Sequence, residues 1–396
     1  MRLPLLLISL IVIFNIAIDL YIWHTIKRTC RHCKSISRIY AISSIILTIF
    51  IITAIALPRK SGSDTVLVSV MWMIYSYFSI YIPKLLYCII LWMSIPFQKY
   101  VTRQKSNLIG IIVAFFAFTI MWWGAAINRL NIKVANIDVI SSTVPEAFDG
   151  YRILQFSDFH VGTYGSDTSY VHKVVECIND LKPDLVVFTG DIVNRRTTEL
   201  MPFISILSKI KAQDGVISIL GNHDYGDYCS WPDNNAKDKN LIKMDSLQRA
   251  MGWMLLRNQS SVITRGTDSI KVIGVENWGE HPFKKYGDLQ KAYPHPDDSN
   301  FKILLTHNPE HWRREIAPND SMKIALTMSG HTHAMQIQAG HWSPSAWRYS
   351  TWGGLYKTKN NNDKQLYVNI GLGTVGVPAR IGATPELTLL TLRKQK

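Results

Sequence analysis

The chain has 396 residues, of which 47% are hydrophobic, and carries a formal net charge of +14. Residues 1–130 hold 13 Lys and Arg but only two acidic residues, whereas the remainder holds 30 basic and 27 acidic residues. Most of the excess charge lies beside apolar segments, where basic residues set topology and meet anionic headgroups, so it does not indicate a nucleic-acid partner.

The first third of the chain, residues 1–130, is predicted to be a transmembrane region. A helix needs about 20 mostly apolar residues to span a bilayer, and four stretches reach about that length: residues 3–23, 39–57, 66–95 and 108–127. The third contains Pro83-Lys84, and we expect one long or kinked helix there because no loop separates two spans. A cleaved signal peptide is the alternative for the first stretch, but three more spans follow it and it lacks a clear cleavage site.

Basic residues are unequally distributed among the loops that join these stretches. The loop at residues 24–38 carries five and the loop at 98–107 carries three, whereas the loop between them has Arg59 and Lys60 against Asp64. The positive-inside rule therefore predicts that the first and third loops are cytoplasmic. The remainder of the chain would then be extracytoplasmic.

Two further features of this region leave their roles open. Asp19 lies near the end of an apolar stretch, where a functional role and an interfacial role are both compatible with the sequence. Cys30 and Cys33 form a CRHC stretch in a basic loop. A zinc knuckle there would need a second pair of ligands nearby, and the sequence does not offer one.

After a predicted linker at residues 131–149, short β-rich runs alternate with helical patterns. We expect helices at residues 170–181, 199–211 and 241–251, and strands at 152–157, 185–189, 216–220, 270–275, 302–305, 323–327, 366–370 and 387–392. Strand–helix alternation argues for α/β units early in this region, with more β pairing later. We therefore predict one α/β domain over residues 150–396.

Polar residues gather where five of these strands end. The clusters are Asp158 and His160 in QFSDFH, Asp191 in FTGD, Asn222 and His223 in LGNHD, His307 in LLTHNP, and His331 and His333 in MSGHTH. Residues two apart in an extended chain point to the same side, so each such pair is expected to face one point. Gly190, Gly221 and Gly330 lie beside the clusters, where the chain must turn sharply. Active sites of α/β sheets form at the carboxyl ends of strands.

The chemistry of this set indicates a metal centre. It offers two carboxylates, one amide oxygen and four imidazoles, besides the imidazole of His223, and such ligands suit divalent first-row metals. Seven ligands are too many for one tetrahedral ion and fit two ions that share a bridging carboxylate. Two metals about 3.5–4 Å apart stabilise attack on phosphorus and activate the nucleophilic water.

The ordinary interpretation of an isolated histidine is a packed or surface residue. We keep that interpretation for His172, His281, His295, His311 and His341. A single GD or NHD is usually turn chemistry, but five strand-end clusters in one chain go beyond it.

In this order, the motifs DFH, GD, GNHD, a lone H and GHTH resemble those of the calcineurin-like metallophosphoesterases, over roughly residues 150–393. The closing segment GLGTVGVPARIGATPELTLLTL is similar to that of the membrane-attached bacterial members, some of which cleave the pyrophosphate of nucleotide-linked lipid A precursors. The resemblance implies a four-layer α/β/β/α sandwich after an N-terminal four-helix transmembrane region. Phe159 and Ala334 depart from the family pattern without removing a ligand.

The resemblance also implies roles for the clustered residues. Asp158, His160 and His333 would bind one metal, Asn222, His307 and His331 the second, and Asp191 would bridge both. His223 would not be a ligand but would face the substrate and protonate the leaving group or stabilise charge. Asp224 is a candidate to orient His223. The metal identity, Mn, Fe or Zn, stays open.

We therefore expect a dinuclear metal-dependent phosphohydrolase, anchored in a bacterial inner or cell membrane, that acts on a phosphorylated small molecule or a lipid. The oligomeric state stays open. Arg380, in the Gly-rich closing loop, is the candidate cation for a substrate phosphate, with an ordinary surface arginine as the alternative. Residues 281–296 and 341–356 are candidates for a lid or a lipid-facing edge.

Two rival functions remain. A metal-containing sensor or scaffold without turnover is disfavoured by the intact His223. A transporter with a regulatory phosphoesterase domain is disfavoured because the predicted spans hold few charged residues.

Overall fold

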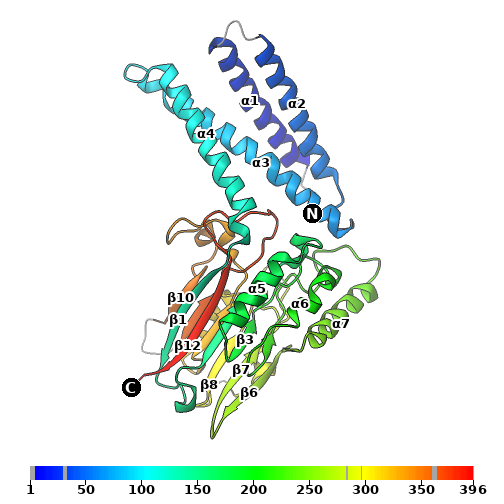
Figure 1. Ribbon diagram of the computed structural model, residues 1–396, viewed down its shortest axis with the longest axis vertical. Helices are drawn as coiled ribbons and strands as arrows, with labels where there is room; N and C mark the ends of the chain where they lie inside the picture. The colour runs from blue at the N-terminus through cyan, green and yellow to red at the C-terminus, as the bar shows by residue number, and fades with distance from the viewer. Residues whose placement is uncertain (1–4, 30–33, 282–283, 296, 359–363, 396) are drawn as a thin grey trace. The chain divides into compact units, whose positions relative to one another are not determined.

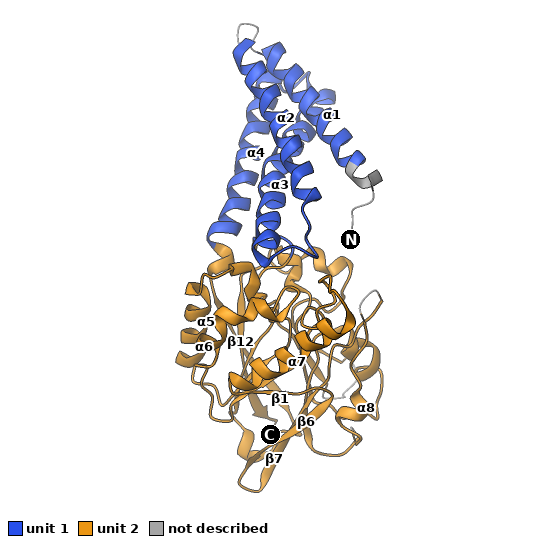
Figure 2. Cartoon of the chain, turned by 90° about the vertical axis from the view of Figure 1, so that its right-hand side faces the viewer, with its two compact units in different colours: residues 1–127, 376–379 blue, residues 128–375, 380–396 orange. Residues whose placement is uncertain are grey.

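The computed structural model describes residues 5–29, 34–281, 284–295, 297–358 and 364–395. Cys30 and Cys33, considered above as metal ligands, lie outside these ranges. The chain divides into two compact units, coloured separately in Figure 2. The first comprises residues 1–127 with 376–379, and the second comprises 128–375 with 380–396.

The first unit contains four helices that are long and apolar enough to cross a membrane, which confirms the expected number of spans within the described residues. Their bounds are Leu5–Thr29 for α1, Lys34–Ala56 for α2, Asp64–Met93 for α3 and Arg103–Ala126 for α4. The side chains of Ser63 and Thr102 accept hydrogen bonds from backbone N–H groups of the first turns of α3 and α4, which explains where these helices begin. Pro83 lies inside α3, which continues past it as one helix.

A polar cluster joins three of these helices. The carboxylate of Asp19 on α1 accepts hydrogen bonds from the hydroxyl of Tyr40 on α2, at 2.7 Å, and from that of Tyr81 on α3, also at 2.7 Å. Lys84 on α3 forms an ion pair with the same carboxylate at 2.9 Å. Asp19 is therefore part of an inter-helix contact inside the helical unit.

The second unit is built on two six-stranded sheets. The first sheet has the order β1-β12-β2-β3-β4-β5, in which β2 to β5 run parallel and β12 pairs antiparallel with β2. Its strands are β1 (Lys133–Ser141), β12 (Glu386–Lys394), β2 (Arg152–Phe156), β3 (Leu185–Phe188), β4 (Val216–Ser218) and β5 (Trp253–Leu255). Strands β1 and β12 lie side by side in Figure 1 and pair in parallel over nine residues.

The second sheet has the order β10-β11-β9-β8-β7-β6, with four parallel strands at its centre and an antiparallel strand at each edge. Its strands are β10 (Gly354–Lys357), β11 (Gln365–Val368), β9 (Leu326–Ser329), β8 (Phe301–Leu305), β7 (Asp268–Gly274) and β6 (Gln259–Arg265). The central strands β8 and β9 are buried along their whole length, as parallel strands covered on both faces must be.

Helices cover the outer faces of both sheets. On the first sheet lie α5 (Ser169–Asp180), α6 (Ile204–Leu207) and α7 (Asn234–Ala250), and on the second lie α8 (Leu289–Ala292) and a π-helical turn at Trp312–Ile316. Helix α5 shows why: Val171, Val174, Val175 and Ile178 follow the helical spacing and are all buried against the first sheet. Burial of each such side chain stabilises the fold by about 1.5–3 kcal/mol.

A second core fills the space between the sheets. Ile153 and Val187 of the first sheet belong to the same buried cluster as Val272 and Leu305 of the second. With helices on both outer faces, the unit is a four-layer α/β/β/α sandwich, which confirms the predicted fold class.

The structure contains strands β5, β6 and β10, which were not predicted, and it differs from the sequence predictions in two further segments. Residues 131–149, predicted to be a linker, contain β1, whose apolar residues Val139 and Ile137 pack in the core between the sheets. Residues 199–211, predicted to be one helix, instead hold a 3₁₀ segment, Thr197–Phe203, followed by the four-residue α6. Pro202 lies inside the 3₁₀ segment and lacks the N–H that a longer α-helix requires.

Candidate metal centre

Five parallel strands of the two sheets deliver the clustered polar residues to one region. Strands β2, β3 and β4 lead to Asp158, Asp191 and Asn222, while β8 and β9 lead to His307 and His331. Backbone hydrogen bonds join the strand ends within each sheet, from Asp158 N–H to Gly190 and from Gly330 N–H to His307. The Gln155 amide joins the sheets by donating to the carbonyl of Ser329 at 2.9 Å.

The backbone of the cluster is unusual. Asp158, His160, Asp191, His331 and His333 all have positive φ, between 45° and 76°. Left-handed backbone costs a non-glycine residue roughly 1–2 kcal/mol, and it persists only where the surroundings determine it. The paired residues therefore converge through tight turns rather than by alternation along extended chain, contrary to the argument from sequence.

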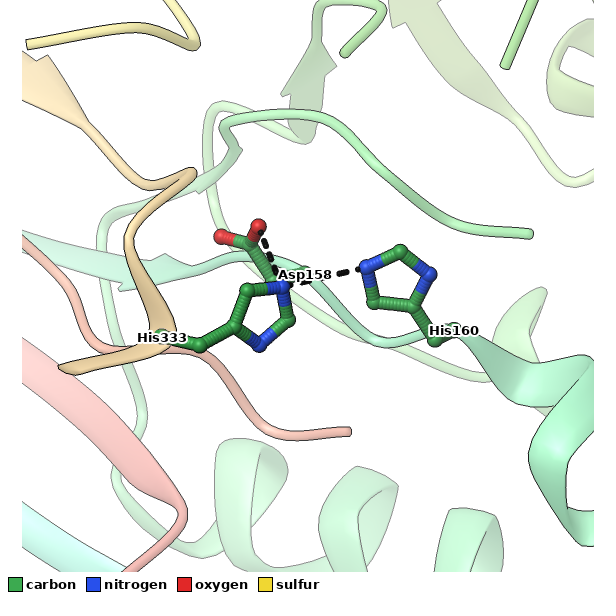
Figure 3. A group of neighbouring side chains, drawn as sticks. All are labelled: Asp158, His160 and His333. Atoms are coloured by element: carbon green, nitrogen blue, oxygen red, sulfur yellow. Dashed lines mark hydrogen bonds and ion pairs between the residues drawn. The ribbon is translucent and has the colours of Figure 1, made fainter. Parts of the chain in front are cut away.

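The side chains of Asp158, His160 and His333 lie close together, as Figure 3 shows. The Nε2 atom of His333 lies 3.1 Å from Oδ1 of Asp158 and 3.2 Å from Nε2 of His160. All three side chains are buried. Ligands bound about 2.0–2.2 Å from one ion are separated by roughly 3.0–3.4 Å, so these spacings fit a shared cation.

A second group forms around Asp191. Its Oδ2 atom lies 3.1 Å from Nε2 of His307 and 3.7 Å from Nε2 of His160. His307 is also 3.9 Å from Asp158, so this carboxylate belongs to both groups of potential metal ligands. The ring of His331 is centred 5.0 Å from that of His307.

Asn222 brings an amide oxygen to the same region. Its Nδ2 donates a hydrogen bond to the hydroxyl of Tyr228 at 2.9 Å. Its Oδ1 is buried and has no hydrogen-bond partner among the described residues. A buried carbonyl oxygen without a hydrogen-bond donor costs about 1–3 kcal/mol of stability. Coordination to a divalent cation would offset this cost.

The local electrostatics also require positive charge. Burial alone would lower the pKa of His307, but Asp191 and Asp158 raise it to about 10. Burial lowers the pKa of His331 to about 3, with His307 contributing. In the protein alone, a proton on His307 would offset the two facing carboxylates, and a divalent ion would take over that role.

Two glycines leave the space that the carboxylates occupy. A Cβ atom on Gly221 would collide with the carboxylate of Asp191, and one on Gly330 would collide with that of Asp158. Neither glycine has a positive φ. Close approach, rather than the sharp turn inferred from sequence, therefore explains them.

Backbone carbonyls and tyrosines orient the histidine rings. Nδ1 of His307 lies 2.8 Å from the carbonyl of Thr189 and donates to it when Nε2 is the ligand. Nδ1 of His223 makes a similar bond to the carbonyl of Asn194, and its ring stacks on Tyr228 with centroids 4.2 Å apart. Nε2 of His331 lies 3.1 Å from the hydroxyl of Tyr349.

Tyr228 and Tyr349 were missed by the sequence argument. Tyr228 follows the GNHD motif by four residues, and Tyr349 lies in the segment 341–356 that was considered a lid or lipid-facing edge. Neither position carries a motif of its own, so only their contacts with Asn222, His223 and His331 reveal them.

Asp224 has partners other than His223. Its carboxylate accepts hydrogen bonds from the backbone N–H groups of Asp191 at 2.8 Å, Gly221 at 2.9 Å, Ile192 at 2.9 Å and Val193 at 3.3 Å. Burial and the nearby Asp191 raise the pKa of Asp224 to about 7, while the N–H donors lower it. Asp224 thus holds the loop that presents Asp191, instead of orienting His223 as the resemblance suggested.

Arg380 also occupies an environment different from the expected one. It is fully buried, and its guanidinium donates to the carbonyls of Gly373 at 2.7 Å, Ile370 at 2.9 Å and Ala383 at 3.1 Å. Its Nη2 atom lies 3.4 Å from Nδ1 of His333. These contacts commit the guanidinium to holding the closing loop beside His333, and they leave it unavailable as a free cation for substrate.

Comparison with known proteins connects both units to phosphoesterases. The family profile described as calcineurin-like phosphoesterase matches residues 151–335, and one described as the transmembrane domain of a probable calcineurin-like phosphoesterase matches residues 1–129. The Bacillus subtilis uncharacterized metallophosphoesterase YkuE is 32% identical over 270 residues, which cover 66% of this chain and 86% of that protein.

Two further relatives differ in how much of their length is shared. The Chlamydia trachomatis UDP-2,3-diacylglucosamine pyrophosphatase LpxG is 27% identical over 336 residues, covering 70% of this chain and 95% of that protein. The Danio rerio transmembrane protein with metallophosphoesterase domain is 28% identical over 276 residues, covering 66% of this chain and 57% of that protein.

Proposed function

Because the chain belongs to the calcineurin-like phosphoesterase family, we propose that it is a membrane-anchored phosphohydrolase that uses two divalent metal ions to cleave a phosphoester or pyrophosphate bond. The observation that carries the proposal is the pair of buried carboxylates, Asp158 and Asp191, which both approach His307 while further imidazoles surround them. Facing carboxylates in one buried site are unfavourable without a cation between them.

We assign the ligands from the sequence motifs and the family that they resemble, and the two groups around Asp158 and Asp191 support part of this assignment. Asp158, His160 and His333 would hold one ion, Asn222, His307 and His331 the other, and Asp191 would bridge them. Divalent ions in such a site polarise the phosphoryl oxygens and supply a nucleophilic hydroxide at neutral pH. Mn, Fe and Zn all suit this donor set.

His223 is the proposed general acid. Its Nδ1 is engaged with the Asn194 carbonyl, which fixes the ring and directs Nε2 away from that bond. The ring is centred 4.8 Å from that of His160, next to the proposed first ion but outside both groups of potential ligands. A proton held at Nε2 would be transferred to the oxygen of the leaving group.

The substrate is proposed to be a phosphorylated lipid or a lipid-linked phosphate or pyrophosphate. Two observations support this class: the four apolar helices that anchor the chain, and the similarity to a protein named as a UDP-2,3-diacylglucosamine pyrophosphatase. From the loop charges we also propose that the α/β domain is extracytoplasmic in a bacterial membrane. Protease added to intact cells without an outer membrane, or to spheroplasts, would digest the domain if so, whereas protection until lysis would contradict this topology.

The deciding experiment measures turnover of bis-p-nitrophenyl phosphate and p-nitrophenyl phosphate by the full chain in nanodiscs, with and without Mn²⁺. Asp191→Asn is the matched variant, because the amide keeps the shape but loses the bridging charge. Metal-dependent turnover that the variant loses supports the proposal. Two bound metal ions per chain without turnover of either ester, or of a membrane-embedded lipid phosphate, would favour the sensor or scaffold instead.

A further inference from the structure

Beside the metal centre, four apolar side chains are exposed on two short segments. Met335, Ile337, Trp342 and Trp347 are 46%, 42%, 45% and 80% exposed; we call them the apolar rim. Tryptophan is on average highly buried in folded proteins. Two exposed tryptophans close together therefore indicate a surface that meets an apolar partner.

Hydrogen bonds and ring packing hold the two segments of the apolar rim together. Residues Ala339 and Trp342 exchange both backbone hydrogen bonds, at 2.9 and 3.1 Å. The hydroxyl of Ser343 donates to the carbonyl of Ala334, which ties the second segment to the first. The rings of Trp342 and Trp347 pack edge to face with centroids 5.5 Å apart.

The rim directly adjoins the proposed catalytic site. Met335 follows the proposed ligand His333 by two residues, within a turn in which residues 333–336 all have positive φ. Tyr349 follows Trp347 by two residues and lies 3.1 Å from His331. A partner that covers the rim would therefore lie next to the metal centre.

The charge of this segment selects the kind of partner. Residues 334–358 contain no Asp or Glu, but they contain Arg348 and Lys357 together with three tryptophans and two tyrosines. Tryptophan and tyrosine prefer the boundary between headgroups and acyl chains. Basic residues beside them are attracted to anionic headgroups; here Lys357 and Arg348 supply the positive charge, and Arg348 also pairs with Glu280 at 3.1 Å. An apolar protein partner would have no reason to exclude acidic residues in this way.

We propose that the apolar rim inserts into the headgroup–acyl boundary of a lipid bilayer. The four apolar helices make a bilayer available to the chain at all times. The inserted rim would position the neighbouring metal centre at the level of lipid phosphates. That last consequence rests on the proposed phosphohydrolase function, whereas insertion itself does not.

Photo-crosslinking tests insertion with the full chain in nanodiscs made of phosphatidylcholine and phosphatidylglycerol. Trp347 is replaced by p-benzoylphenylalanine, the sample is irradiated, and lipid adducts are quantified by mass spectrometry. The same replacement at Ile242, which is 64% exposed on α7, is the matched control. We expect a several-fold higher yield of phospholipid adduct at position 347 than at position 242.

Two outcomes would overturn the inference. Equal or absent lipid adducts at the two positions would show that the rim lies away from the bilayer. Crosslinks between two chains at position 347 would show that the rim is a protein interface. The adduct yield is independent of catalysis. A chain that inserts but turns over neither aryl ester nor a membrane-embedded lipid phosphate would therefore refute the proposed function and leave insertion standing.

Discussion

The two units of this protein bury charged groups in opposite ways. In the helical unit, the carboxylate of Asp19 receives an ion pair from Lys84 and two hydroxyl donors, so its charge is balanced within the protein. In the α/β unit, Asp158 and Asp191 face His307 and raise its pKa, and the Asn222 oxygen lacks a partner among the described residues. A balanced cluster holds a structure together, whereas an unbalanced one requires a ligand.

The largest effect should come from removing divalent ions, because only one of the two clusters needs them. Chelation is expected to abolish phosphoester turnover. Mn²⁺ at about 100 times its Kd should stabilise the α/β unit by about 2.7 kcal/mol, which corresponds to a rise of roughly 5–10 °C in its Tm. Thermal unfolding of the full chain with and without Mn²⁺ measures the shift.

The variant Asp19→Asn serves as the control for this experiment. The ion pair in the helical unit contains its own cation, so the Mn²⁺-dependent rise in Tm should be unchanged by this substitution. An unfolding temperature that does not respond to Mn²⁺ in the unmodified chain would contradict the metal centre itself.

A substitution at His223 separates chemistry from metal binding. His223→Gln should lower kcat for bis-p-nitrophenyl phosphate by about 10²–10⁴-fold, as expected for loss of a general acid, with the metal content per chain unchanged. His172→Gln on the exposed face of α5 is the control. If metal is lost together with activity, His223 is a ligand and the assignment of roles is wrong.

Substitutions at Asp19 and Lys84 in the helical unit should have coupled effects on stability. Lys84→Met leaves the Asp19 carboxylate without its cation, and the loss of one partner of a buried pair should cost about 3 kcal/mol. The double variant Asp19→Asn with Lys84→Met should recover most of this stability, because no unpaired charge remains. A double-mutant cycle on unfolding in nanodiscs measures the coupling, and additive losses would show that the pair contributes little.

The smallest effects are expected at Tyr228 and Tyr349, which contact the proposed ligands Asn222 and His331. Tyr228→Phe removes the acceptor of the Asn222 amide, and Tyr349→Phe removes the partner of His331. Each should weaken metal affinity by about 10–100-fold, with kcat at saturating Mn²⁺ near that of the unmodified chain. Metal titrations followed by turnover provide the measurement.

Tyr151→Phe is the matched control for these variants. Tyr151 directly precedes β2, at the end of the strand opposite the metal centre, and its hydroxyl donates a hydrogen bond to the carboxylate of Asp214. Its loss should leave the metal titration unchanged. Equal metal affinities for all three variants and the unmodified chain would show that the tyrosine hydroxyls do not position the ligands.

Local patterns in the sequence predicted the parts of the fold that depend on local chemistry. The spans follow from the lengths of their apolar runs, and the buried strands β2, β3 and β8 follow from short apolar runs that end in polar residues. Edge strands β1, β5, β6 and β10 were missed because most of their residues are partly or fully exposed. Strand β1 also has a distant partner, β12, about 250 residues later in the chain.

The chemistry of this protein can be predicted from its sequence: which residues bring carboxylates, imidazoles and an amide, in which order, and after which strands. How these groups are used depends on the folded structure. It placed Asp224 under the backbone of Asp191, buried Arg380 in the closing loop, and set Tyr228 and Tyr349 behind the ligands. Those assignments depend on which backbone donors and acceptors remain unsatisfied after the two sheets pack, and that is a property of the packed fold rather than of any local stretch of sequence.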